Sequence, residues 1–571
     1  MLHICMRQLR ECRRHAVADF YLRRCLREMK GENMAAVKRL FTALLYGTVG
    51  ILTGIVLVFS LLTVMVFRQY EQNDLFDVVQ EHTGWLLISM AAVLLIFGLV
   101  VRSLDRRTGA GAEECVRQPG RSEDTIYGRA VFPWPMVLVS GGFSLFLVLV
   151  IRGMATNDAL QLDVIMQEFS RGNYDSLQMG GYLYVYPFQV SYVLIGQLIA
   201  GVCGDSNYLV YQLLNVISIV CNLYCLYQIT WELFHDRRIC AVMQMLSMGC
   251  WFYYVFATFI YSDLWSFAFQ TAALLWEIRY LREHRIYQMA GAGVWIAVAS
   301  LLKTNCYVAL IAMICLLLWD GLQSRKWIGW GRLAAMILML FVMTFGLQKA
   351  VNAAVARTAG LSSMPSGTPA ITYIAMGMQE TEGKCGWYNG TNVALYRESG
   401  FEQEAAEEAA KASIRESIGE FQNSGRYLVK FYLKKFLSQW GDPTCVSMRE
   451  MEETDRHAES VSALAESLIF GTGSRILQWG MNVMHSVIYL GVFVYLWVRA
   501  GHSLRKRKRQ EIQSGEILIV LFLFGGMMFH QLWEASGRYV MRYYLTMLPL
   551  SAWGITWLLQ QAGRRGHNPQ T

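Results

Sequence analysis

Charged side chains are scarce in this sequence: Asp, Glu, Lys and Arg make up 16% of its 571 residues, whereas hydrophobic residues make up 54%. The apolar residues fall in long runs, without the helical or strand period of a surface segment. This composition excludes a soluble protein. Runs of about 20 apolar residues cross a bilayer as helices, which satisfy their own backbone polar groups in lipid. We therefore expect an all-α polytopic membrane protein.

Other features are missing as well. The 13 cysteines include no Cys-x-x-Cys pair and no Cys/His spacing typical of zinc. No inverted-topology repeat is visible, and ionisable residues are sparse in the middle of the apolar runs, which weakens the interpretation as a transporter. The net charge of +8 comes from Lys and Arg clustered in short loops, where the positive-inside rule explains them, so no nucleic-acid partner is expected. Cys385 and Cys445 share the largest polar segment and could form a disulfide.

About twelve membrane spans are predicted from the apolar runs. They are Phe41–Phe67, Trp85–Val101, Val131–Ile151, Tyr208–Phe234, Ile239–Phe259, Leu264–Trp276, Met289–Leu302, Cys306–Trp319, Leu333–Leu347, Ile476–Val498, Ile517–Trp533 and Tyr543–Leu559.

The basic loops orient these spans, because they fall on one face and predict it to be cytoplasmic, together with both termini. The basic loops fall on one face only if the apolar run Tyr184–Val202 does not cross the membrane. Its start is aromatic and interrupted by Pro187, and a Gly-Asp-Ser-Asn turn ends it. We therefore expect an interfacial helix there.

The predicted organisation has six parts. They are a basic cytoplasmic segment 1–39, in which Met34 is an alternative start to Met1; an added hairpin and loop 40–130; a transmembrane core 131–350 with an outer loop 152–207; a large extracytoplasmic segment 351–475; C-terminal spans 476–560; and a cytoplasmic tail 561–571.

Several short motifs lie at the predicted extracytoplasmic ends of spans. They are Asn157-Asp158 just after the third span, Tyr184-Val185-Tyr186-Pro187, Tyr261-Ser262-Asp263, Leu302-Lys303-Thr304 and Glu534-Ala-Ser-Gly-Arg538-Tyr539.

This pattern resembles the GT-C superfamily of polytopic glycosyltransferases from Val131 to about Leu559. The likeness is greatest to bacterial members related to protein O-mannosyltransferases (glycosyltransferase family 39) and to the aminoarabinose transferase of lipid A. Asn157-Asp158 is similar to the family's Asp-Glu-x-x-Tyr motif, but Ala159 replaces the second acid and Leu162 the tyrosine. The departure leaves Asp158 as the matching carboxylate.

The resemblance implies an inverting transfer of a sugar from a polyprenyl-phosphate donor to an acceptor outside the cytoplasmic membrane, such as a cell-wall or surface polysaccharide, a teichoic acid or a lipid. Asp158 would be the general base, and Arg538 and Lys303 would contact the phosphate. Further substrate contacts are expected from Glu534, Asp263, Asp163, Tyr184 and Tyr186. No metal is expected, although Asp158 with Asp263 or Asp163 could hold a divalent cation.

Plainer interpretations remain open for these residues. Asp158 and Asp263 could cap helices, Asp163 could be solvated, and Lys303 could extend to lipid headgroups. Glu534 and Arg538, one helical turn apart, could form an ion pair. A transporter or flippase for a polyprenyl-linked glycan, or a non-catalytic membrane protein of glycan assembly, is the alternative function.

Overall fold

The computed structural model describes residues 37–70, 73–80, 82–115, 133–323, 327–455, 462–504 and 512–566. The two possible start residues, most of the basic N-terminal segment and the basic run at 505–509 lie outside these residues.

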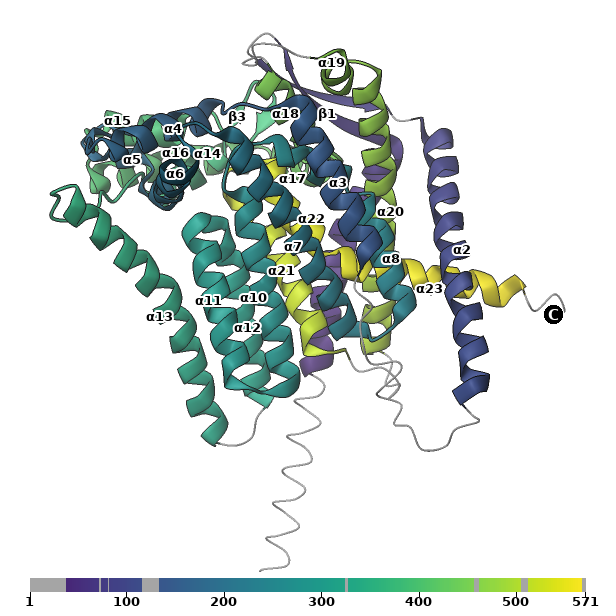
Figure 1. Cartoon of the computed structure of the whole chain (residues 1–571). Coiled ribbons are helices and arrows are strands. Elements are labelled where there is room, and N and C mark those ends of the chain that lie inside the picture. The colour runs from purple at the N-terminus through teal and green to yellow at the C-terminus, as the bar shows by residue number, and fades with distance from the viewer. Residues whose placement is uncertain are drawn as a thin grey trace, which may run out of the picture.

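Long helices that stand side by side form the body of the protein (Figure 1). Among the described residues, eight helices are long and apolar enough to cross a membrane, and up to ten spans result if two bent pairs are counted. The eight are Val37–Leu62, α2 (Thr83–Cys115), α3 (Trp134–Ile151), α7 (Tyr208–Phe234), α12 (Tyr307–Gln323), α13 (Trp327–Thr358), α20 (Thr472–Leu504) and α21 (Ser514–Leu532). The antiparallel pair α10 (Asp263–Glu283) and α11 (Ile286–Leu302) packs among them. The chain is therefore an all-α polytopic membrane protein, as predicted.

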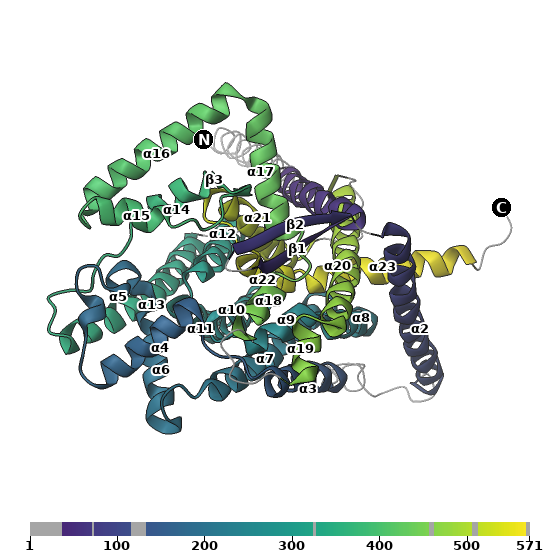
Figure 2. The same cartoon turned by 90° about the horizontal axis from the view of Figure 1, so that it is seen from above.

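Predicted spans differ from the structure at several places. The predicted span Ile239–Phe259 is divided into the segments Arg237–Met248 and Trp251–Thr258, which are bent by 52°. The first helix ends at Leu62, and Thr63–Tyr70 pairs as strand β1 with β2 (Asn73–Gln80), because the β-branched residues in Thr63-Val-Met-Val favour an extended backbone. The last predicted span, Tyr543–Leu559, is divided at Met547 into α22 (Gly537–Thr546) and α23 (Leu548–Gly566). Helix α23 lies across α20 in both views (Figures 1 and 2).

The run predicted as an interfacial helix is bent and lies across the long helices. The segments Asp175–Val185 and Pro187–Cys203 meet at 102°, at the residue that precedes Pro187. The first segment holds η2 (Asp175–Leu177) and α5 (Tyr182–Val185), and the second holds η3 (Pro187–Gln189) and α6 (Val190–Cys203). Both views show α6 lying across the long helices, beside α4 (Asn157–Ser170), as expected of a helix in the membrane interface (Figures 1 and 2).

A polar layer covers the end of the bundle at which α4 and α6 lie (Figure 2). Besides α4 to α6 it contains α14 (Ala370–Gly377), β3 (Glu380–Thr381), β4 (Lys384–Cys385), α15 (Thr391–Glu398), α16 (Gln403–Asn423), α17 (Gly425–Trp440), α18 (Ser447–Asp455) and α19 (Ala463–Ile469). Cys385 and Cys445 are both free thiols, so the disulfide considered from the sequence is not formed.

Lys435, on the basic helix α17, ties the polar layer to the bundle. Its buried ammonium donates to the carbonyls of Gly377 at 2.5 Å, Gln531 at 3.0 Å and Trp533 at 2.8 Å. Gly377 and Gln531 lie in the last turns of α14 and α21, where carbonyls have no partner within their own helix, and Trp533 directly follows α21. Lys435 therefore fixes the turn that follows α21.

Lys435→Met is expected to lower the free energy of unfolding by about 2 to 4 kcal/mol, because it leaves buried carbonyls without a donor. Lys434→Met is the matched control, since Lys434 is only partly buried and its ion pair among the described residues is with Glu380, at 3.4 Å. Its effect should stay below about 0.5 kcal/mol. Equal unfolding curves for the two variants in detergent would contradict this role.

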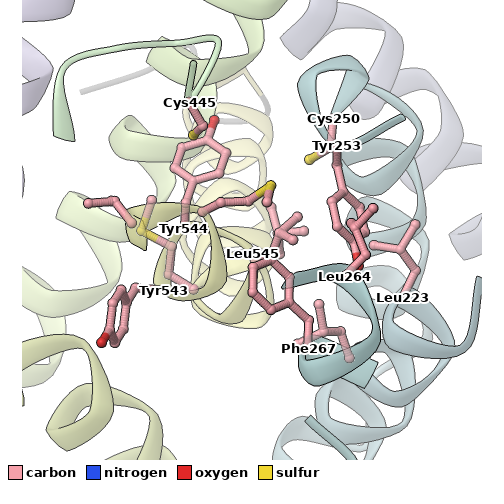
Figure 3. Packing of buried hydrophobic residues seen from close by; sticks show 14 of the residues in the cluster. Leu223, Cys250, Tyr253, Leu264, Phe267, Cys445, Tyr543, Tyr544 and Leu545 are labelled. Atoms are coloured by element: carbon pink, nitrogen blue, oxygen red, sulfur yellow. The ribbon is translucent and has the colours of Figure 1, made fainter. Parts of the chain in front are cut away.

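Helix α22 is buried between two groups of helices. Tyr544 lies beside Cys445 and Leu545 lies beside Phe267 and Leu264, whereas Tyr543 points away from them (Figure 3) and packs against Phe522, with ring centres 4.6 Å apart. Phe267 and Leu264 belong to α10. Tyr253 belongs to α9 (Trp251–Val255), which follows α8 (Arg237–Met248) and continues as η4 (Phe256–Thr258). Packing on both sides fixes the rotation of α22 and so the direction of its first polar residue, Arg538.

Candidate functional site

Four turns at one end of the bundle bring most of the predicted site residues together. They are the start of α4 with Asp158, the start of α10 with Asp263, the turn after α11 with Lys303, and the turn between α21 and α22 with Glu534 and Arg538. Lys303 and Arg538 both lie beside the ring of Tyr261, 4.4 Å and 5.4 Å from its centre.

Asp158 is exposed in the first turn of α4. The helix cap is Thr156, so Asp158 does not serve as the cap. Its charge favours the helix N-terminus. Burial, Tyr261 and the Asp158 carboxylate together hold the pKa of Tyr182 far above its usual value. Asp158 therefore faces the aromatic side chains that line the rest of the site.

Asp263 and Lys303 form a buried ion pair. Lys303 Nζ lies 3.1 Å from Asp263 Oδ2, and the two side chains are only 12% and 2% exposed. The ammonium also lies 4.4 Å from the centre of the Tyr261 ring. Burial lowers the pKa of Lys303, and Asp263 opposes that change. Lys303 therefore points into the protein and not to lipid headgroups, and Asp263 pairs with it while Ser262 occupies the cap position of α10.

Arg538 approaches the same aromatic residues from α22. Its guanidinium lies 5.3 Å from the Phe259 ring centre and 5.4 Å from that of Tyr261. Within the described residues, its one ion-pair contact is with Glu450 Oε1, at the limiting distance of 4.0 Å, and its Nε has no hydrogen-bond partner. Part of its donor capacity is thus available to an anion.

Glu534 does not pair with Arg538, as one interpretation of the sequence suggested. Its Oε1 accepts a hydrogen bond from the Tyr539 hydroxyl at 3.2 Å. Burial raises the pKa of Glu534 to about 7; Asp158 adds to the rise, while Arg538, Tyr539 and Lys303 oppose it. Glu534 is therefore a second carboxyl group near Asp158 that changes charge close to neutral pH.

This pKa predicts a pH dependence of stability. A carboxyl group whose pKa is raised from 4.5 to about 7 on folding binds its proton more tightly in the folded state, so stability falls as pH rises through that window. The loss amounts to about 3 kcal/mol. Glu534→Gln should flatten this part of the curve of unfolding temperature against pH, and a curve parallel to that of the unaltered protein would contradict the assignment.

Gly537 allows α22 to begin close to a strained loop. A Cβ at this position would lie 2.7 Å from Val446 Cγ2, a distance that real side chains do not tolerate. The loop is shaped by Asp442, whose carboxylate accepts hydrogen bonds from the backbone of Thr444 at 2.8 Å and Val446 at 2.7 Å. Asp442 is thus the turn residue suggested by the motif Trp-Gly-Asp-Pro.

The remaining predicted residues are placed differently. Asp163 is buried beside the turn before α7, where it accepts hydrogen bonds from Ser206 Oγ at 2.6 Å and Tyr208 Oη at 2.9 Å. Tyr184 packs against Phe401 of the polar layer, with ring centres 5.6 Å apart. Tyr186 lies nearer to Asp158, whose charge contributes, after burial and Tyr388, to the raised pKa of its hydroxyl.

Two groups of site residues were not predicted. Arg542 is buried one turn after Arg538 and donates to Gln270 Oε1 at 2.8 Å. Helix α18 brings Arg449, Glu450 and Glu453 against the site. The run Met-Arg-Glu-Met-Glu-Glu is the available signal for α18, but its charges resemble those of a solvated helix.

The acidic residues do not form a metal site among the described residues. No group of three or more His, Cys, Asp or Glu side chains there could hold an ion. Asp263 is paired with Lys303, and Asp163 is bonded to Ser206 and Tyr208. Two of the three carboxylates considered for a divalent cation are thus engaged by other side chains, and both the cation and metal-free transfer stay predictions.

A cavity lies at the other end of α10, the length of that helix away from Asp263. It is lined by Tyr280, His284, Leu317, Asp320, Gly321, Gly329, Arg332, Leu333 and Met336. None of the predicted site residues is among them. We place the candidate site at the start of α10 because the exposed carboxylate and the cations converge there.

Comparison with known proteins gives a distant structural likeness and a family match. No curated protein matches the chain. An oligosaccharyltransferase from Archaeoglobus fulgidus, solved in its apo form, is similar with 14% identity and a TM-score of 0.40 over 79% of this chain and 53% of the other. The chain thus spans about half the length of that protein, and a likeness of this degree carries no argument about activity.

A family model described as "Conserved hypothetical integral membrane protein" matches residues 134–561, which is most of the chain from α3 to α23. The match leaves out the helix Val37–Leu62, the β1–β2 hairpin and α2, the part predicted as an addition to the core. The chain therefore belongs to this family of integral membrane proteins.

Proposed function

We propose that the protein is a membrane glycosyltransferase that moves a sugar from a polyprenyl-phosphate donor to an acceptor at the extracytoplasmic surface. One observation carries the proposal: an exposed carboxylate, Asp158, shares a site with two cations, Lys303 and Arg538, at the end of the bundle next to the interfacial helix α6. A lipid phosphate would lie at the same level as these cations.

The arrangement supports a single displacement. Asp158 accepts the proton of the acceptor hydroxyl as its oxygen attacks the anomeric carbon, and the bond from that carbon to the phosphate oxygen breaks. The leaving polyprenyl phosphate takes the electron pair and is stabilised by Lys303 and Arg538. Attack from the face opposite the phosphate inverts the anomeric configuration. One carboxylate is sufficient for this route, whereas a retaining mechanism needs a second as nucleophile.

The distribution of positive charge supports an extracytoplasmic site. Arg279 and Arg282 lie at the end of α10 opposite to Asp263, and Arg237 and Arg238 begin α8. Positive residues favour the cytoplasmic side of a membrane, so the other end of the bundle faces outward.

Purified protein in detergent, given undecaprenyl-phosphate-linked hexoses and a glycan acceptor, tests the proposal. We expect release of undecaprenyl phosphate together with a glycosylated product. A protein that transports these lipids across vesicle membranes but leaves them intact would be a flippase, and that result would overturn the proposal.

A further inference from the structure

Helix α18 connects the two halves of the site through a chain of polar contacts. Asn157, the residue before Asp158, donates a hydrogen bond from Nδ2 to Glu453 Oε1. Arg449 Nη1 lies 2.9 Å from Glu453 Oε2 and 3.2 Å from Glu450 Oε1. The same Glu450 oxygen lies 4.0 Å from Arg538 Nη1. The contacts thus run from the neighbour of Asp158 to Arg538.

The backbone of Asn157 needs such support. Its φ of 46° is in the left-handed region, which costs free energy for residues other than glycine, although asparagine tolerates it better than most. The hydrogen bond to Glu453 holds the side chain of this residue in one direction. Because Asn157 is the first residue of α4, its conformation sets the direction of the turn that carries Asp158.

Close packing fixes α18 against this turn. Glu450 and Glu453 are 8% and 4% exposed, so their charges lie inside the protein and depend on the contacts described above. A Cβ at Gly153 would lie 2.5 Å from Thr454 Cγ2 and 2.7 Å from the carbonyl oxygen of Thr258. The chain between α3 and α4 therefore lies directly on α18, without room for a side chain at Gly153.

We propose that Glu453 is a positioning residue that fixes Asp158 through Asn157 and couples it to Arg538 through Arg449 and Glu450. The inference rests on the proposed function, because it requires Asp158 to be the general base. A carboxylate held on the wrong side of the acceptor hydroxyl loses the gain from orientation even when both substrates still bind. Glu453 should thus affect turnover more than binding.

Three variants test this role in the full-length protein. Glu453→Ala is expected to lower kcat about 10-fold or more with less than about a 2-fold change in the KM for the donor. Glu453→Gln keeps an oxygen for Asn157 and should recover most of that loss. Asn157→Gly keeps the left-handed backbone, removes only the side-chain contact, and remains informative if Glu453→Ala fails to fold. Glu466→Ala, an exposed acid on the neighbouring helix α19, is the control and should leave kcat unchanged.

The double variant adds a sharper criterion. If Glu453 acts through Asn157, Asn157→Gly combined with Glu453→Ala should be no slower than the slower single variant. A kcat equal to that of the unaltered protein in Glu453→Ala, or losses that add in the double variant, would overturn the inference. Asp158→Asn, measured in parallel, separates the two claims: if it is inactive while Glu453→Ala is fully active, the proposed base stands and the positioning role fails.

Discussion

Asp158→Asn is expected to lower kcat for sugar transfer by about 10³-fold, within the range that general bases contribute. The amide has nearly the shape of the carboxylate but cannot accept the proton of the acceptor hydroxyl. The side chain is exposed in the first turn of α4 and is not the cap of that helix, so the variant should fold and reach the membrane. Release of polyprenyl phosphate by the purified variant is the measurement.

Glu168→Gln is the matched control for this prediction, because it makes the same chemical change near the far end of the same helix. Its kcat should stay within about 2-fold of the unaltered value, as expected for a substitution away from the reacting groups. If Asp158→Asn retained more than about a tenth of the activity, Asp158 would not be the base.

Lys303→Met is the second substitution with a large expected effect. It leaves Asp263, which is 1% exposed, as a buried carboxylate without its partner, and loss of one member of a buried pair costs about 3 to 5 kcal/mol. It also removes one of the two cations proposed to bind the donor phosphate. Both the free energy of unfolding in detergent and the affinity for the donor should therefore fall.

A double variant separates these two effects. Lys303→Met combined with Asp263→Asn removes both charges of the pair, so most of the lost stability should return. The affinity for the donor should remain low, because the cation is still missing. A double variant that binds the donor as well as the unaltered protein would show that Lys303 is only a structural partner of Asp263.

The sequence was most informative where a residue lies in a short turn at the end of a span. Asp158, Asp263, Lys303 and the pair Glu534 and Arg538 are far apart along the chain, but the order of the spans places all of them at one end of the bundle. Topology alone therefore predicts that they meet. Their roles as base or phosphate ligands remain predictions, since they depend on substrates that the fold does not identify.

The sequence was less informative about polar residues that tertiary packing buries. Lys435 lies among exposed lysines in α17 and differs from them because three carbonyls converge on it. Glu450 and Glu453 likewise have the composition of a solvated helix, and only the packing of α18 against the start of α4 shows their contacts. Asp163 was expected near the substrate, but the turn before α7 folds back onto it. None of these contacts has a local sequence signature.

The most direct test of the central claim is to follow the donor lipid. Purified protein in detergent is mixed with undecaprenyl-phosphate-linked hexoses and a glycan acceptor, and both the free lipid phosphate and the configuration of the new glycosidic bond are determined. We predict release of undecaprenyl phosphate and an inverted linkage, both lost in Asp158→Asn. Retained configuration, or release that is equally fast in Asp158→Asn, would contradict the account.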